Sequence, residues 1–364
     1  MKKSYLDIVK DYNEENYFYK STIIINYIND QLLSSQGERN YKVTSLHLFE
    51  SNDLINMQKL SNLVERCNKS IIKDGTFYTW QVFYVYKELL QGLLGEELGF
   101  NYFRGQSDNY DLLPGALRKN TNKFYIDEFE SIYRKMAYEF PDKLKYIALS
   151  GDSAITEREC HLSLLQHYGL KTALLDITKN PFIAMLFMLS DTINEYKEPT
   201  LYLFKINDHN VDNEKITLFS EVEKSQVNER INAQKGAFLN YEKVLLEKNE
   251  LKKISYVKII LRFDTEKYSS VIDGEIDLLN KMKTKVDRSI IDTFRYVLEK
   301  EKTDCSKTKV ECIDYINCEL NKKLHEYFYT KEDMFPDFEN KIRYLSNKYN
   351  KYEKQDKSYN KAKE

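Results

Sequence analysis

Polar and charged residues interrupt otherwise apolar sequence in three short segments. They read YFRGQ at 102–106, LLQHYGLKTALLDITKNPFIA at 164–184 and NERINAQKGAFLNY at 228–241. In the first segment, Arg104 presents a planar guanidinium that can bind a phosphate or a carboxylate through two hydrogen bonds. Gly105 beside it would let a backbone amide approach the same ligand closely. This pair predicts a site for an anionic ligand such as a nucleotide.

The second segment contributes groups that can hold or transfer a proton. His167 is a candidate general acid or base near neutral pH, or an imidazole that satisfies a free carbonyl at the end of an expected helix. Asp176 either shapes the site or caps the helix that follows it, bracing Thr178. Arg104 also has a structural alternative, an ion pair with Asp176 or Asp108 that fixes local geometry. Both interpretations stay open for each residue.

The third segment centres on Gln234, which stands in apolar, strand-like sequence. A buried amide needs hydrogen-bond partners, and the simplest candidates are a ligand or the loop that carries Arg104. An amide can bind a ribose hydroxyl, but it cannot stabilise positive charge as a carboxylate does. Glu229 and Glu242 flank Gln234, and either is a candidate for that carboxylate.

Together, the three segments resemble the FRG domain, a family named for a Phe-Arg-Gly motif. The motif stands here as Phe103, Arg104 and Gly105. The second and third segments are similar to two further family patterns, which are met by Gln166, His167, Gly169, Thr172, Leu174, Leu175, Asp176, Thr178, Pro181, Ala184, Arg230, Ile231, Ala233, Gln234, Gly236 and Phe238. The resemblance extends over residues 41–345, including MFPDFENKI near the end. Ala173 and Ile177 depart from it, because arginine and tryptophan are usual there.

The resemblance implies a setting and a chemistry. FRG proteins are mostly bacterial or phage-borne, which implies a conflict effector, in antiphage defence or toxicity. The segments also look loosely like ADP-ribosyltransferases, in which an arginine on an early strand anchors NAD and a later glutamate faces the developing positive charge. We therefore expect an effector that transfers ADP-ribose or cleaves NAD, with NAD as substrate and no metal.

On this interpretation the candidate site residues fall into two groups. The candidates for catalysis are Arg104, His167, Asp176, Gln234 and Glu242, and those for binding the cofactor are Phe103, Arg104, Gly105, Gln106, Thr172, Thr178 and Gly236. The alternative is a non-catalytic module whose cleft recognises a nucleotide, a nucleic-acid end or a phage protein. A nuclease is less favoured, because Asp176 lacks the acidic neighbours that metal-dependent cleavage needs.

Composition limits the other functions to consider. The chain has 364 residues and a formal charge of −2 from 55 basic and 57 acidic residues, so no global field draws it to nucleic acid or membranes. Its five cysteines form no CxxC pair, which favours reduced thiols. No apolar run is long enough to span a bilayer, which predicts a cytoplasmic protein without a membrane partner. P-loop, GxGxxG, HExxH and GxSxG motifs are absent, which disfavours the enzymes that use them.

Hydrophobic spacing predicts an α+β fold, with helices flanking a mixed or antiparallel sheet. Residues 1–40 and 53–97 look helical, and 41–51 fits either a short strand or a turn. Strands are expected at 171–177, 200–206 and 256–263, and helices at 157–168, 180–191 and 286–299. Gly169 is expected to end one helix, and Thr178 or Asn180 to cap the next, with Pro181 in its first turn.

These elements suggest three regions. Residues 1–97 would form a mainly helical N-terminal region, of which 41–97 leads into the FRG domain. Residues 98–345 would form the body of that domain, and 346–364 a disordered, charged tail. The N-terminal helices would supply the interface with a macromolecular partner or a second copy of the chain.

Overall fold

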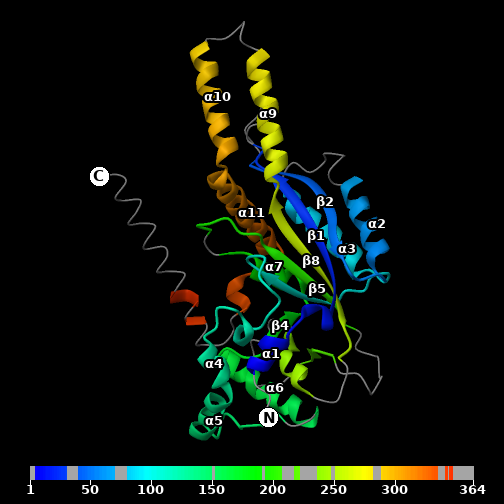
Figure 1. The fold of residues 1–364 in the computed structure, drawn as a ribbon, viewed down its shortest axis with the longest axis vertical. Helices are drawn as coiled ribbons and strands as arrows, with labels where there is room; N and C mark the ends of the chain where they lie inside the picture. The colour runs from blue at the N-terminus through cyan, green and yellow to red at the C-terminus, as the bar shows by residue number, and fades with distance from the viewer. Residues whose placement is uncertain are drawn as a thin grey trace, which may run out of the picture.

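The computed structural model describes residues 5–30, 40–69, 80–149, 152–190, 193–206, 217–221, 236–246, 251–281, 288–334, 341–342 and 344–346. Within these ranges, eight strands form one sheet in the order β2-β1-β8-β5-β3-β4-β7-β6 (Figure 1). The strands are β1 (Phe18–Ile28), β2 (Lys42–Ser51), β3 (Tyr102–Gln106), β4 (Leu174–Thr178), β5 (Thr200–Lys205), β6 (Phe219–Ser220), β7 (Gly236–Asn240) and β8 (Ile254–Phe263). The expected α+β class is confirmed, and of the two expected kinds of sheet, mixed or antiparallel, the mixed one is correct.

Helices cover both faces of this sheet. They are α1 (Tyr5–Asp11), α2 (Met57–Cys67), α3 (Gln81–Leu94), α4 (Lys123–Asp127), α5 (Phe129–Glu139), α6 (Asp152–His167), α7 (Pro181–Met188), α9 (Thr265–Lys281), α10 (Arg288–Thr303) and α11 (Ser306–Glu326). Short 3-10 helices include η1 (Glu14–Asn16), after α1, and η4 (Tyr241–Leu245), after β7. None of the described helices combines the length and apolar content that crossing a bilayer requires.

The expectation that residues 1–40 are helical is wrong for β1. This strand contains the run Ile23, Ile24, Ile25, whose side chains are all buried. A β-branched run that is buried on both faces of a sheet does not alternate, so periodicity alone separates it poorly from a buried helix. β1 pairs in parallel with β8 along nearly its whole length and antiparallel with β2. For residues 41–51, the strand was the correct alternative.

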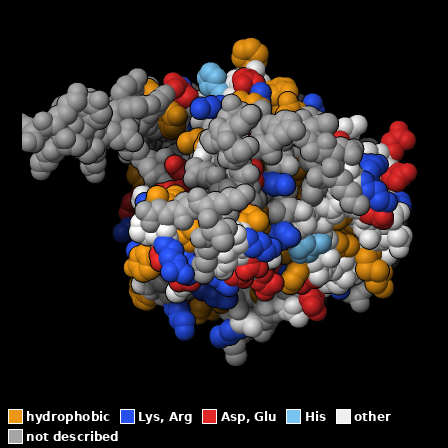
Figure 2. Space-filling view, turned by 90° about the horizontal axis from the view of Figure 1, so that it is seen from above, with side chains coloured by type: hydrophobic (Ala, Val, Ile, Leu, Met, Phe, Trp, Pro, Cys, Tyr) orange, Lys and Arg blue, Asp and Glu red, His pale blue; other side chains and the backbone are white. Residues whose placement is uncertain are grey.

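The pleat of the strands divides the core into two clusters. Phe103 of β3 and Leu203 of β5 belong to one cluster, which α2, α3, α7 and α11 cover. Their chain neighbours Tyr102 and Tyr202 belong to the other, with α1, α4, α5 and α6. Because successive side chains of a strand point to opposite faces, the two clusters lie on opposite sides of the sheet. On the part of the surface described in Figure 2, basic and acidic side chains are interspersed.

Local signals near β4 act as the sequence predicts. α6 ends at His167, and Gly169 follows it with a left-handed φ of 95°, while the amide of Leu170 donates to the carbonyl of Leu165. Asn180 caps α7, because its side-chain oxygen accepts hydrogen bonds from the amides of Phe182 and Ile183. Of the two caps considered, Asn180 is correct. Most of the expected tail, 347–364, lies outside the described residues.

Candidate functional site

Arg104 occupies β3 near the centre of the sheet, opposite Tyr202 of β5. Its side chain is partly exposed. Nη1 donates to the main-chain oxygen of Asp176 at 2.7 Å. Nε donates to the amide oxygen of Gln106 at 3.2 Å when that amide is oriented so that its nitrogen donates to the carbonyl of Tyr110. Two neutral acceptors therefore hold the guanidinium, and Nη2 has no hydrogen bond to the described residues.

The charge of Arg104 is not neutralised by an ion pair with any described carboxylate. Burial lowers the pKa of Arg104, the charge of Asp176 raises it, and Arg118 lowers it. Arginine stays protonated at neutral pH despite such shifts. The alternative of an ion pair with Asp176 or Asp108 is not adopted. Asp108 instead accepts from the amides of Asn109 and Glu198.

Arg118 is a second cation near this site that the sequence analysis did not single out. Its Nε donates to the carbonyl of Leu113 at 3.2 Å, and its side chain is exposed. Its charge contributes to lowering the pKa of Arg104. Two arginines that share one region without a described carboxylate partner attract an anion. In the sequence, Arg118 stands in the same stretch as the Arg-Gly pair, 101–118, and this closeness could have marked it as a candidate.

Gly105 serves the contact between β3 and α7. A Cβ at this position would lie 1.8 Å from the carbonyl oxygen of Ala184 and 2.7 Å from the amide nitrogen of Met188. Both atoms are backbone, so no side-chain movement relieves the clash. Phe103 is buried in the core on the same side of the sheet. Both candidate residues therefore face α7, on the side of the sheet opposite Arg104.

A network of three side chains orients the carboxylate of Asp176. The Gln166 amide nitrogen donates to both carboxylate oxygens at 2.9 Å. The Thr172 hydroxyl donates to the Gln166 amide oxygen, so it fixes which end of the amide faces Asp176. Asp176 itself is exposed. Gln166 matched the family pattern but was missing from the expected site, because the sequence does not reveal that it reaches β4.

The remaining expected residues lie in several places. Thr178 is buried and accepts a hydrogen bond from the amide of Asn180. It also pairs with Phe103 on one side and Gly236 on the other. His167 is the last residue of α6, with its ring edge-on to that of Tyr168. Gln234 and Glu229 lie outside the described residues.

Glu242 lies in the core, 0% exposed. Its carboxylate accepts hydrogen bonds from Nε and Nη2 of Arg158, both at 2.8 Å, and from the hydroxyl of Tyr5 at 2.6 Å. Burial by itself lowers the pKa of Arg158, but the bond and charge of Glu242, together with Glu130, raise it overall. This cluster joins α1, α5, α6 and η4. The structure therefore places Glu242, a candidate for catalysis, in a buried ion pair with Arg158.

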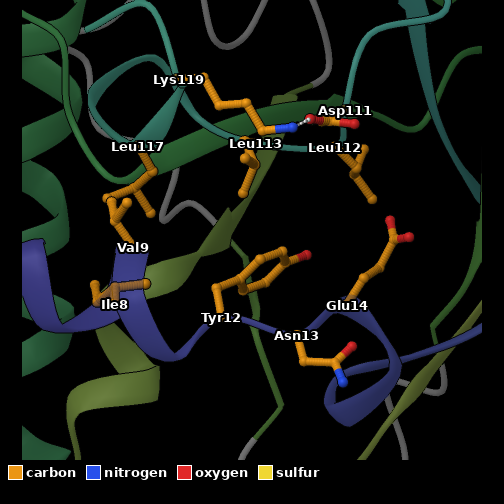
Figure 3. A pocket seen from close by; sticks show the side chains of 10 residues that line it. All are labelled: Ile8, Val9, Tyr12, Asn13, Glu14, Asp111, Leu112, Leu113, Leu117 and Lys119. Atoms are coloured by element: carbon orange, nitrogen blue, oxygen red, sulfur yellow. Dashed lines mark ion pairs between the residues drawn. The ribbon is translucent and has the colours of Figure 1, made fainter.

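A cavity of about 380 Å³ opens between α1, η1 and the segment that follows β3 (Figure 3). It is lined by Ile8, Val9, Tyr12, Asn13, Glu14, Asp111, Leu112, Leu113, Leu117 and Lys119. The hydroxyls of Tyr202 in β5 and Tyr241 in η4 donate to the carbonyls of Tyr110 and Leu112, and these bonds hold the chain segment that forms one wall of the cavity. Arg104 is not among the lining residues. In the described part of the chain, no three His, Cys, Asp or Glu side chains are grouped as metal ligands.

Comparison with protein families gives one match, in which the model of the FRG domain covers residues 100–197. The chain contains an FRG domain. No curated protein and no solved structure matches the chain. The matched FRG segment includes Arg104, Arg118, Gln166, Thr172 and Asp176, and it ends before Gln234 and Glu242. The similarity to ADP-ribosyltransferases is not among these findings.

Proposed function

We propose that the FRG domain binds NAD or a related nucleotide at Arg104, and that the protein transfers ADP-ribose from it or cleaves it. The observation that carries this proposal is the environment of Arg104. Neutral oxygens of Asp176 and Gln106 fix the guanidinium, and Nη2 has no partner in the described residues. A cation that is preorganised but not neutralised is suited to binding a phosphate.

Asp176 supplies the second half of the site. Its main-chain carbonyl accepts a hydrogen bond from Arg104, and Gln166 orients its exposed carboxylate. Asp176 therefore places a carboxylate near the guanidinium of Arg104. A ribose hydroxyl can donate to this carboxylate, because each carboxylate oxygen has a lone pair beyond the one used by the amide. Arg104 would hold the phosphate and Asp176 the ribose of the same nucleotide.

The same carboxylate suits the chemistry. When the bond between the ribose C1′ and nicotinamide breaks, nicotinamide leaves with the electron pair and positive charge develops on the sugar. A carboxylate beside the sugar stabilises that charge. Water or a target nucleophile then bonds to C1′ and gives up its proton, for which His167 is the candidate acceptor. Used in antiphage defence or toxicity, this reaction would consume NAD or modify a target.

A non-catalytic nucleotide-binding module is the second candidate. The observation that favours it is that both candidate catalytic carboxylates already have hydrogen-bond donors. Arg158 donates to the carboxylate of Glu242, and Gln166 donates to both carboxylate oxygens of Asp176. Such a module would use the same cation and would bind without turnover.

NAD binding by calorimetry and nicotinamide release separate the two candidates. Arg104→Gln should weaken NAD binding about tenfold to 100-fold, because one charge-assisted contact is lost. The matched control is Arg134→Gln, an exposed arginine of α5 that stacks on Tyr146. Asp176→Asn should keep binding within about tenfold and lower release at least about 100-fold.

Each outcome has a distinct meaning. The non-catalytic module would be favoured if NAD binding depends on Arg104 and no nicotinamide is released. The release assay is run both with and without a cell extract as the source of targets. NAD affinity equal in Arg104→Gln and wild type would refute the assignment of Arg104. Release unchanged in Asp176→Asn would remove that carboxylate from the chemistry.

A further inference from the structure

The cavity beside α1 has an apolar end and an acidic end (Figure 3). Ile8, Val9 and Leu117 lie at one end. The carboxylates of Glu14 and Asp111 lie at the other. The volume of about 380 Å³ is at the lower end of the range for small-molecule sites, roughly 300–1,000 Å³. This lining suits a small ligand with an apolar body and a charged head.

The carboxylate of Glu14 is held in place by a neutral group. Its Oε1 accepts a hydrogen bond from the hydroxyl of Tyr256 in β8 at 3.0 Å. Burial and the charge of Glu14 raise the pKa of Tyr256, so this hydroxyl stays protonated and acts as the donor. Glu14 forms no ion pair with any residue that the structure describes. A carboxylate that is oriented but not neutralised attracts a cation.

Asp111 is the second carboxylate, and its ion pair is open to solvent. Nζ of Lys119 lies 3.4 Å from Oδ2 of Asp111, and the two side chains are 90% and 66% exposed. An exposed pair of this kind contributes little, because both groups stay hydrated and the long lysine side chain loses conformational entropy. The cationic head of a ligand can therefore compete with Lys119 for Asp111.

Lys258 of β8 is a further cation near these carboxylates. Its Nζ lies 5.4 Å from the ring centre of Tyr202, and it is not among the residues that line the cavity. Burial and the charge of Lys20 lower the pKa of Lys258, whereas the charges of Glu14 and Asp111 raise it. Because neighbouring lysines offset part of the negative charge, the acidic end suits a ligand with a single positive charge.

We propose that this cavity binds a small primary amine, with its ammonium group at Glu14 and its hydrocarbon body at the apolar end. A primary ammonium group has three donors, so it can bond both carboxylates at once. The ring of Tyr12 lies between the two ends, where its face can pack against the ligand and attract the cation. Arg104 does not line the cavity, so this site is independent of the proposed nucleotide site.

Ligand-observed NMR titration of the full chain with hexylamine tests the proposal. Hexylamine should bind to wild type with a Kd of about 0.1–1 mM, as expected for a ligand of about seven heavy atoms. Hexanol and hexanoate have the same chain length and lack the positive charge. Hexanol should bind at least about tenfold more weakly than hexylamine, and hexanoate more weakly still.

Two variants address the two ends of the cavity. Glu14→Gln should raise the Kd of hexylamine at least about tenfold, because the amide still accepts from Tyr256 but carries no charge. Glu15→Gln is the matched control, since Glu15 is exposed, has the same charge and does not line the cavity. Val9→Trp should abolish binding by filling the apolar end, and Val9 is 44% exposed, so the larger side chain has room at the surface. Circular dichroism should give equal helix content for all four proteins.

Several outcomes overturn the proposal. One is the lack of saturable binding below about 10 mM hexylamine, and another is hexanol binding as tightly as hexylamine. Equal weakening by Glu14→Gln and Glu15→Gln would indicate attraction to surface charge alone, and full binding by Val9→Trp would place the amine elsewhere. The titrations contain no nucleotide, so they succeed or fail whether or not Arg104 binds NAD. Displacement of hexylamine by NAD would make the cavity part of the nucleotide site and would contradict the proposal.

Discussion

Two arginines of the matched FRG segment illustrate how differently the same side chain is used. Arg104 is partly exposed and bound by neutral oxygens, so its charge remains available. Arg158 is 0% exposed and lies between the carboxylates of Glu242 and Glu130. Its guanidinium also lies over the ring of Tyr133. Arg104 suits ligand binding, whereas Arg158 holds four segments of the chain together.

Glu242→Gln should destabilise the protein by about 3–5 kcal/mol, because it leaves the buried charge of Arg158 with only Glu130 as a charged partner. Urea unfolding monitored by circular dichroism measures this loss. The matched control is Glu157→Gln on the same helix as Arg158, whose exposed ion pair with Lys145 should contribute less than about 1 kcal/mol. A Glu242→Gln protein as stable as wild type but defective in NAD binding would return Glu242 to the site.

At the scale of elements, the contact between β3 and α7 explains why a glycine follows Arg104. Successive residues of a strand face opposite sides of the sheet, so Arg104 and Gly105 point in opposite directions. The glycine allows α7 to approach the strand backbone, and the arginine occupies the other side. The Phe-Arg-Gly motif therefore combines a core residue, a partly exposed cation and a packing residue.

Gly105→Ala should lower stability by about 1–3 kcal/mol or more, because the added methyl meets backbone atoms of α7. Gly274→Ala in α9 is the control: a Cβ there has no neighbour within 4 Å, and alanine favours the helix by up to about 1 kcal/mol. Thermal unfolding of both variants provides the comparison. If Gly105→Ala keeps its stability and loses nucleotide affinity, the glycine serves the ligand, as the sequence first indicated.

For the whole molecule, the sheet depends on strands far apart in the chain. β3 and β4, both inside the matched FRG segment, share only the pair Phe103–Thr178. Their main partners, β5 and β7, lie beyond residue 197. β1 supplies the parallel partner of β8, and the residues of both strands fill the core. The segment that defines the family is thus only part of the folding unit.

A fragment of residues 98–345, the expected body of the FRG domain, should fail to fold cooperatively. Without β1 and β2, the edge of β8 and the apolar side chains beneath it would be exposed. A chain of residues 1–346, which keeps both strands, is the control. Urea unfolding and the dispersion of amide NMR signals distinguish the two. Native dispersion in the 98–345 fragment would show that the N-terminal strands are dispensable.

The sequence by itself determined the local features of this protein. The turn at Gly169, the cap at Asn180 and the strands β4, β5 and β8 depend on residues a few positions apart, and the expected mixed sheet followed from them. The Phe-Arg-Gly and Gln-His patterns lie inside the matched FRG segment, 100–197, whereas the third pattern and the rest of the expected range, 41–345, lie outside that match.

Only the tertiary structure decided which charged groups are buried in ion pairs and which stay exposed. Arg158 and Glu242 are 84 residues apart, and their burial depends on four segments meeting. The hydrogen bond between Gln166 and Asp176 likewise depends on how α6 packs beside β4. The apolar run of β1 is compatible with a helix, and only its pairing with β8 shows that it is a strand. Burial and pairing depend on the whole chain, so no local spacing could have specified them.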